Sequence, residues 1–357
     1  MRKILSILIL LLPVTGLYAQ EETIDTLIMN KIRAEGLNNS KVSWIAHHIT
    51  DVTGPRLTNS PGYTKAVEWI TKTLSSWGLT NVIAEPWGEF GYGWSVDKSY
   101  AALRYPYYTN LTAYPAPWSG GTNGLITAPV FLLDNYDSLY IAKNADKIKG
   151  QIVMYKTIDT VIKSSFKPES SRYSDSELTN MQDQHMFSKE MLKMFVPTIV
   201  KQMNATKQIQ RAGALAVLEM TREEADGAVF VDGFGGWEKK DQPALTKLLM
   251  SKEDYLKIER LLKNGTAVSL DLDIKTTLHG DDLKSYNVVG EIAGTDPSLK
   301  AEVVMLGGHL DSWQSATGAT DNAAGCIANM EAIRILKALG IKPKRTIRIA
   351  LWSGEEQ

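Results

Sequence analysis

The stretch that decides the fold is AEVVMLGGHLDSW, Ala301 to Trp313. It begins with apolar and β-branched residues, which are typical of a strand buried at the centre of a sheet. Two other runs, YNVVGEI (Tyr286 to Ile292) and RTIRIALW (Arg345 to Trp352), have the same character. Between the first run and the last, apolar residues recur at helical spacing: Cys326, Ile327, Met330, Ile333 and Leu336. The pattern predicts a strand–helix–strand unit whose two strands are parallel.

Polar side chains follow both strands of this unit at the point where each strand ends. GGHLDS places His309 and Asp311 after the first strand, and SGEE places Glu355 and Glu356 after the second. Asp321, in GATDNAAG, begins the intervening helix. Open α/β sheets bind ligands at the carboxyl ends of their parallel strands. We therefore expect these five side chains to converge at one edge of the sheet.

This combination of side chains suits zinc, which binds imidazole nitrogens and carboxylate oxygens. Asp321 is the natural bridge if two ions are present, because one carboxylate can contact two metals. Asp311 could accept the second N–H of the His309 imidazole. The adjacent Glu355 and Glu356 diverge, so one can bind metal while the other handles protons. Taken singly, such residues are more often hydrogen-bonded or solvated groups, and only their joint placement favours a metal site.

Composition limits the classes of protein to consider. With 357 residues, 44% of them hydrophobic, the chain can bury a sizeable core and is expected to hold more than one domain. The net charge of −1, with dispersed Lys and Arg, offers no basic stripe, which excludes nucleic acid as an expected partner. Cys326 is the single cysteine, so a disulfide framework is excluded as well.

The first residues resemble an export signal. Arg2 and Lys3 precede the apolar run Ile4 to Leu12, and we predict a signal peptide, residues 1–19, cut near Ala19. The alternative is a bilayer anchor, but the run is too short to span a membrane. We expect a secreted or periplasmic protein without a stable membrane anchor.

The middle of the chain is predicted to alternate strands and helices. It contains no cluster of residue types that are common in catalytic sites. Strands are expected at Pro129 to Leu133, Gln151 to Tyr155 and Ala214 to Met220. SKEDYLKIERLLKNG reads as a capped amphipathic helix that ends at Gly265. The Gly- and Pro-rich PWSGGTNG, Pro117 to Gly124, marks a boundary before this block.

The chain resembles the co-catalytic di-zinc exopeptidases typified by secreted bacterial aminopeptidases and carboxypeptidase Q. Three segments together carry this resemblance: NVVGEIAGTDPSLKAEVVMLGGHLDSW, GATDNAAG and IALWSGEEQ. Asp51 to Leu79 resembles that family's amino-terminal helices, and the middle block resembles an inserted protease-associated domain. The resemblance implies an α/β fold, an incomplete phosphorylase/hydrolase-like three-layer sandwich with a mixed central sheet. It implies peptidase parts at residues 20–118 and 267–357, with an inserted α/β domain at 119–266.

Carried over residue by residue, the family pattern makes His309 a ligand of one zinc ion, Glu356 a ligand of the other and Asp321 the bridge. Glu355 becomes the general base and acid, and Asp311 supports catalysis beside the metal ligands. The family's proteins continue past the position of Gln357 and supply a further aspartate and histidine ligand. We therefore expect these residues to be a piece of a longer protein and to be inactive by themselves.

The resemblance thus implies a two-zinc exopeptidase, an aminopeptidase or a dipeptidase, that acts on peptides or dipeptides, and it leaves a homodimer open. One alternative is a non-catalytic binding protein that retains the protease-associated domain. Another is a single-zinc enzyme similar to glutaminyl cyclase, against which the inserted block argues. Substrate side-chain preference is not readable from the sequence, because pocket shape decides it.

Overall fold

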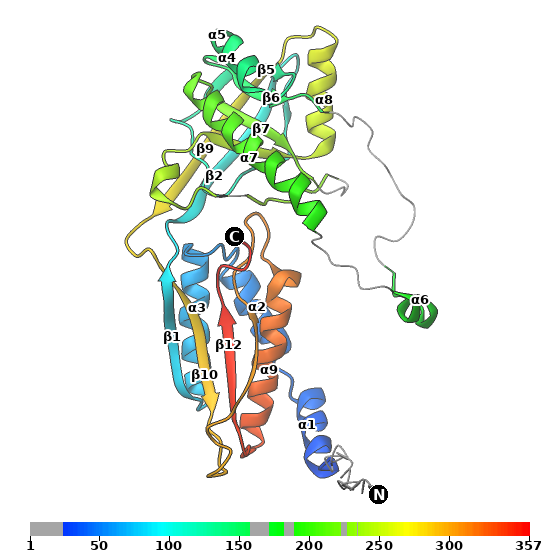
Figure 1. Cartoon of the computed structure of the whole chain (residues 1–357), viewed down its shortest axis with the longest axis vertical. Helices are drawn as coiled ribbons and strands as arrows, with labels where there is room; N and C mark the ends of the chain where they lie inside the picture. Colours follow the sequence, from blue (N-terminus) through cyan, green and yellow to red (C-terminus); the bar gives the residue numbers. More distant parts are fainter. Residues whose placement is uncertain (1–23, 158–170, 182–188, 223–226, 234) are drawn as a thin grey trace, which may run out of the picture.

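The computed structural model describes residues 24–157, 171–181, 189–222, 227–233 and 235–357. The predicted signal peptide, residues 1–19, lies outside these ranges. The described residues form two units, each built around one sheet, that lie end to end along the long axis (Figure 1). We call them the four-stranded unit and the eight-stranded unit. The carboxyl end of the chain lies between them.

The four-stranded sheet has the order β1-β10-β12-β11. Its strands are β1 (Thr80–Glu89), β10 (Lys284–Ile292), β11 (Val303–His309) and β12 (Thr346–Trp352). β10 is antiparallel to both β1 and β12, whereas β11 and β12 are parallel. The predicted mixed sheet is confirmed, and so is the parallel strand–helix–strand unit, because α9 (Ala324–Ala338) connects β11 to β12.

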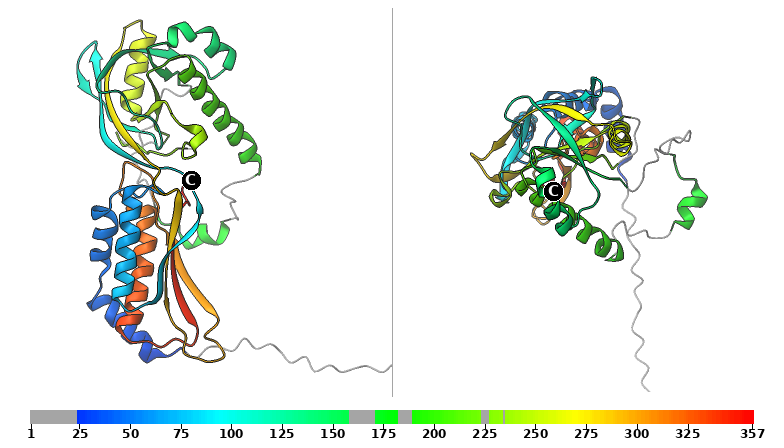
Figure 2. Two further views of the ribbon diagram at one scale, coloured as in Figure 1. Left: turned by 90° about the vertical axis from the view of Figure 1, so that its left-hand side faces the viewer. Right: turned by 90° about the horizontal axis from the view of Figure 1, so that it is seen from above.

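Helices cover one face of this sheet, as the left view of Figure 2 shows. They are α1 (Thr26–Asn38), α2 (Val42–His47), the π-helical turn η1 (His48–Val52), α3 (Pro61–Ser76) and α9. α3 starts with a capped first turn, since the Ser60 hydroxyl accepts the Tyr63 N–H at 3.2 Å and Pro61 is the first helical residue. Apolar residues of α3 and α9, such as Ile70 and Met330, are fully buried against Ile349 of β12.

The eight-stranded sheet has the order β3-β2-β9-β5-β6-β7-β8-β4. Its strands are β2 (Gly93–Tyr105), β3 (Thr109–Asn110), β4 (Ala113–Pro115), β5 (Ile126–Leu133), β6 (Ile152–Tyr155), β7 (Ala216–Met220), β8 (Thr246–Met250) and β9 (Ser269–His279). The helices of this unit are α4 (Ser138–Lys143), α5 (Ala145–Ile148), α7 (Lys189–Arg211), the short 3₁₀ turn η2 (Lys239–Asp241) and α8 (Lys252–Lys263). The short helix α6 (Asp175–Asn180) has no buried residues.

The eight-stranded sheet extends beyond the bounds that we expected for the inserted domain. β2 precedes residue 119 and β9 follows residue 266, yet β9 pairs with both β2 and β5. Hydrogen bonding therefore joins the two long strands to this unit. The bounds 119–266 stay a prediction, and the sheet favours a unit that runs from Gly93 to His279.

Among the described residues, no helix has both the length and the apolar character needed to cross a membrane. The longest, α7, contains 23 residues and has many polar side chains.

We predict that Ile349→Ala lowers the free energy of unfolding by about 2–5 kcal/mol, because it leaves a cavity at a fully buried position of the sheet. Urea-induced unfolding followed by circular dichroism measures the change. Val304→Ala is the matched control, since Val304 on the neighbouring β11 is 52% exposed, and it should cost under about 1 kcal/mol. If the two substitutions lowered the free energy of unfolding equally, the placement of Ile349 in the core would be wrong.

Candidate metal centre

His309 is the last residue of β11, and its imidazole is surrounded by carboxylates. Its Nε2 atom lies 3.0 Å from Oδ1 of Asp321 and 3.7 Å from Oε2 of Glu355. The His309 side chain is only 12% exposed, whereas that of Asp321 is 75% exposed and that of Glu355 is 61% exposed. The imidazole is therefore fixed in the protein, while the carboxylates beside it remain accessible.

One potential ligand atom each from His309, Asp321 and Glu356 lies within 4.8 Å of the other two. Asp321 lies in η3 (Ala319–Ala323), the kinked turn before α9, where its backbone is extended rather than helical (φ −116°, ψ 101°). Three segments far apart in the sequence thus bring three ligand types to one point. The roles of these residues as zinc ligands stay a prediction, but the expected convergence is present.

Asp311 is fully buried beneath the cluster and holds the loop that carries Glu356. Its Oδ2 accepts the backbone N–H of Glu356 at 3.1 Å and the Thr58 hydroxyl at 3.3 Å. The same hydroxyl oxygen accepts the Gly354 N–H at 3.1 Å. Asp311 and Thr58 together therefore position the loop that follows β12.

The contact between His309 and Asp311 differs in detail from our expectation. The nearest acceptor to Nδ1 is the main-chain oxygen of Asp311 at 3.2 Å, and the carboxylate Oδ1 lies at 3.5 Å. Oδ1 is buried and has no hydrogen-bond partner among the described residues. When a cation occupies Nε2, the proton resides on Nδ1 and can be donated toward Asp311.

The site also depends on Arg56, which our sequence reasoning missed. This guanidinium is fully buried and donates to the main-chain oxygens of Leu310 (2.8 Å), Thr317 (2.6 Å) and Gly318 (2.9 Å). These acceptors flank both the His309 strand end and the turn that bears Asp321. Nothing in the local sequence indicated this role, because the contacts join residues 254 to 262 positions apart.

The electrostatics of the cluster show an excess of negative charge. Burial alone would lower the pKa of His309, but the surrounding carboxylates, of which Asp311 has the strongest effect, raise that pKa to about 9. Burial, followed by repulsion from Asp321 and Asp311, raises the pKa of Glu356 to about 7. A divalent cation between these groups would supply the missing positive charge, and the nitrogen and oxygen donors are those that zinc prefers. The residues present therefore fit a zinc centre.

The remaining described histidines lie away from this cluster. His47 pairs with Asp51 at 2.9 Å on an exposed helix surface, and His279 contacts the Ser95 hydroxyl at 2.9 Å. Within the described ranges, the cluster at His309 is the one group of His, Cys, Asp or Glu residues arranged to hold a metal.

Comparison with known proteins gives matches to peptidases. Residues 287–357, which contain the whole cluster, match Peptidase family M28. The chain is 28% identical over 312 residues to carboxypeptidase Q of Pongo abelii and 27% identical over 312 residues to that of Homo sapiens. Each match covers 87% of this chain and 57% of the relative, so the chain spans little more than half the length of these relatives.

Solved structures show the same fold. A Peptidase M28 precursor from Shewanella amazonensis SB2B matches with a TM-score of 0.60 at 23% identity, over 92% of this chain and 67% of that protein. A zinc aminopeptidase from Bacillus subtilis matches with a TM-score of 0.53 at 16% identity, over 88% of this chain and 61% of that protein. The expected fold class and the expected resemblance to co-catalytic zinc exopeptidases are confirmed.

We predict that His309→Ala weakens zinc binding by more than about 100-fold, because loss of a ligand should exceed the cost of losing a residue that only orients one. Isothermal titration calorimetry with zinc chloride measures this. His47→Ala is the control, since it removes an imidazole that is also paired with a carboxylate but lies outside the cluster. Undiminished zinc affinity in His309→Ala would exclude the assigned site.

We also predict that Asp311→Asn weakens zinc binding by about 10–100-fold without altering the set of ligands. The amide keeps the size of the side chain but removes the negative charge facing Nδ1 of His309. The same titration measures the change. An Asp311→Asn protein with wild-type zinc affinity would show that the buried carboxylate serves the fold alone.

Proposed function

We propose that the protein is a zinc-dependent exopeptidase that removes amino-terminal residues from peptides or splits dipeptides. The observation that carries this proposal is the triangle of His309, Asp321 and Glu356, with Glu355 on the side open to solvent. The match of residues 287–357 to Peptidase family M28 supports it. We further propose that the chain is exported, on the basis of the signal-like residues 1–19.

In this proposal two zinc ions are held by residues of the cluster. His309 and Glu356 would be ligands of different ions, and Asp321 would supply a carboxylate that the two ions could share. Zinc acts as a Lewis acid and lowers the pKa of water toward neutrality. The part of this chain is to fix the donors: Asp311 orients the imidazole of His309 and, through its contact with the Glu356 N–H, the loop after β12.

Glu355 is the proposed proton carrier. Its neighbour Glu356 is half-buried and directed into the cluster, whereas Glu355 remains exposed, with one carboxylate oxygen 3.7 Å from Nε2 of His309. An exposed carboxylate at this place can take a proton from the attacking water and give it to the amine that leaves. The divergence of two adjacent side chains thus allows two different roles.

We predict that Glu355→Gln lowers kcat by about 10²–10⁴-fold while zinc binding is retained, because the amide cannot accept the proton. The measurement is hydrolysis of amino-acid p-nitroanilides and dipeptides by the zinc-loaded protein expressed from its full reading frame. Glu68→Gln, on the exposed side of α3, is the control and should keep wild-type turnover. A zinc-loaded wild-type protein that cleaves none of these substrates would contradict the proposed function. Unchanged turnover in Glu355→Gln would contradict the role of Glu355 as proton carrier but would not contradict the proposed function.

A further inference from the structure

A cavity of about 680 Å³ opens beside the metal cluster, between the two units. Residues 313–321 and Glu356 of the four-stranded unit line one side, and residues 228–232 and Arg222 of the eight-stranded unit line the other. Because Asp321 and Glu356 belong to both the cluster and the cavity wall, a molecule bound in this cavity can reach the cluster. Its volume is within the range of small-molecule sites.

The wall from the eight-stranded unit is fixed by two cross-links. The Thr221 hydroxyl, at the end of β7, accepts the N–H of Phe230 at 3.0 Å and donates to its carbonyl oxygen at 3.3 Å. Arg222, the residue after Thr221, pairs with Asp232, two residues after Phe230: its Nη2 lies 3.3 Å from Oδ2 of Asp232. Thr221 is only 1% exposed, so the segment is anchored in the core of its unit.

This wall presents an apolar side chain to the cavity. Phe230 is 54% exposed although its backbone is held, while the neighbouring Val231 is buried and only 4% exposed. Ala316 and Trp313 line the opposite side. A single exposed phenylalanine is ordinary on a protein surface, but one held at the wall of a cavity that Asp321 and Glu356 of the metal cluster also line is positioned to contact a ligand.

The opposite wall is also rigid. Trp313 packs against a buried cluster formed by Leu57, Trp94 and Trp118, the last two being residues of the eight-stranded unit. The indole N–H of Trp94 donates to the carbonyl oxygen of Ser119 at 3.0 Å. The distance between the two walls is therefore set by core packing, which favours recognition of one range of side-chain sizes.

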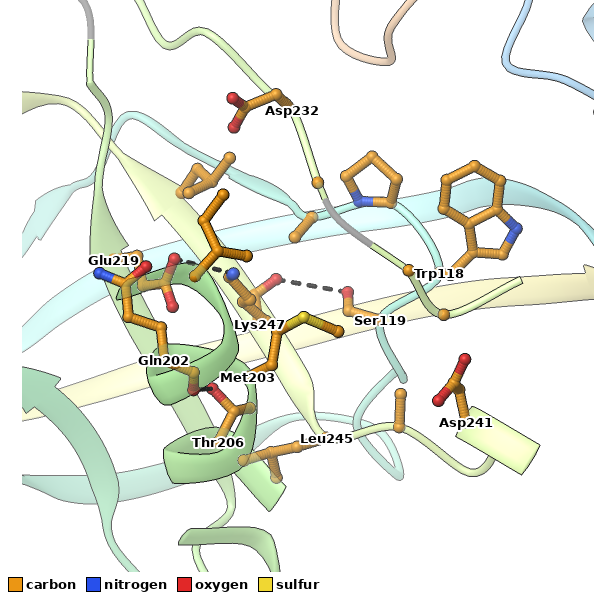
Figure 3. A pocket seen from close by; sticks show the side chains of 18 of the residues that line it. Trp118, Ser119, Gln202, Met203, Thr206, Glu219, Asp232, Asp241, Leu245 and Lys247 are labelled. Carbon is orange, nitrogen blue, oxygen red and sulfur yellow. Dashed lines mark hydrogen bonds and ion pairs between the residues drawn. The ribbon is translucent and has the colours of Figure 1, made fainter. Parts of the chain in front are cut away.

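A second cavity lies behind the wall, beneath α7 (Figure 3). Arg222 and Asp232 line both cavities, so their ion pair separates the two. Figure 3 shows Asp232 at the rim of this second cavity, which also contains the ion pair of Lys247 and Glu219 at 2.8 Å. Charged groups thus face the second cavity, while Phe230 lines only the first.

We propose that Phe230 determines substrate specificity: its ring contacts the side chain of the substrate residue whose peptide bond is cleaved and selects large apolar side chains over glycine. This inference rests on the proposed function for the placement of the substrate at the zinc ions. It assigns to the eight-stranded unit a direct part in substrate selection. Phe230 is not a catalytic residue, because it lies opposite the cluster and carries no group that could transfer a proton.

The test compares binding of two probes that differ only in their side chain, L-leucine hydroxamate and glycine hydroxamate. Isothermal titration calorimetry is performed on the zinc-loaded protein expressed from its full reading frame. We expect the wild-type protein to bind the leucine probe at least about tenfold more tightly, since a few buried methylene groups contribute that much. Phe230→Ala should weaken binding of the leucine probe by about tenfold and leave that of the glycine probe unchanged.

Two further variants separate specificity from folding. Phe230→Leu keeps an apolar side chain and should recover most of the preference. Tyr107→Ala removes an aromatic side chain of the same unit that is 50% exposed and does not line the cavity, and it should behave as wild type. Zinc affinity should be equal in all four proteins, because none of these residues belongs to the metal cluster.

The inference is overturned if the wild-type protein shows no preference or binds neither probe. It is also overturned if Phe230→Ala weakens both probes equally or weakens neither. Selective binding that depends on Phe230 in a protein that hydrolyses no peptide would contradict the proposed function and leave the specificity pocket in place. If the protein hydrolyses peptides and Phe230→Ala does not alter its side-chain preference, the role of Phe230 in specificity is overturned and the proposed function is retained.

Discussion

β11 and β12 pair in parallel so that His309 lies opposite Trp352. From that register, Glu355 and Glu356 follow three and four residues beyond the strand partner of the histidine. A shift of one residue would turn every side chain of one strand to the other face and separate the imidazole from the carboxylates. The register is secured by the burial of Ile349 and its neighbours under α3 and α9. The metal cluster is thus a direct consequence of core packing.

The cluster itself works against the stability of the fold. Asp311 is buried with one oxygen unpaired among the described residues, and burial, followed by repulsion from other carboxylates, raises the pKa of Glu356 to about 7. Such arrangements persist where the surrounding structure enforces them. Here the enforcement comes from Arg56 and Thr58, which tie the three loops of the site to one another. A bound cation that neutralises the carboxylates would stabilise the folded state by mass action.

The parts of this structure that could be predicted from sequence are those encoded by local pattern. The apolar runs and the helical spacing of Met330 and its neighbours gave the strand–helix–strand unit, and strand direction then placed His309 and Glu356 at one edge. Arg56 could not be found this way, because its partners at the site, the main-chain oxygens of Leu310, Thr317 and Gly318, are more than 250 residues away, and backbone atoms leave no trace in residue type. The cavity wall that carries Phe230 could not be predicted from the sequence either, because the cavity depends on how the two units meet.

The extent of the eight-stranded sheet could not be predicted from the sequence for a different physical reason. The composition of β2 and β9 shows that they are strands, but a strand's composition does not reveal which of two sheets it joins. Their pairing is set by an antiparallel register between residues 93–105 and 269–279, which only the folded chain displays. The two long strands connect the units as well as extending the larger sheet, so that the end of β9 leads directly toward β10 (Figure 1).

The most direct test of the central claim is X-ray diffraction from crystals of the zinc-loaded protein, with anomalous data collected at the zinc absorption edge. We predict an anomalous peak about 2.0–2.2 Å from Nε2 of His309 and from a carboxylate oxygen of Asp321, with Glu356 also binding zinc at this site. A zinc peak elsewhere in the molecule, with this cluster empty, would contradict the assignment of His309, Asp321 and Glu356 as the zinc site.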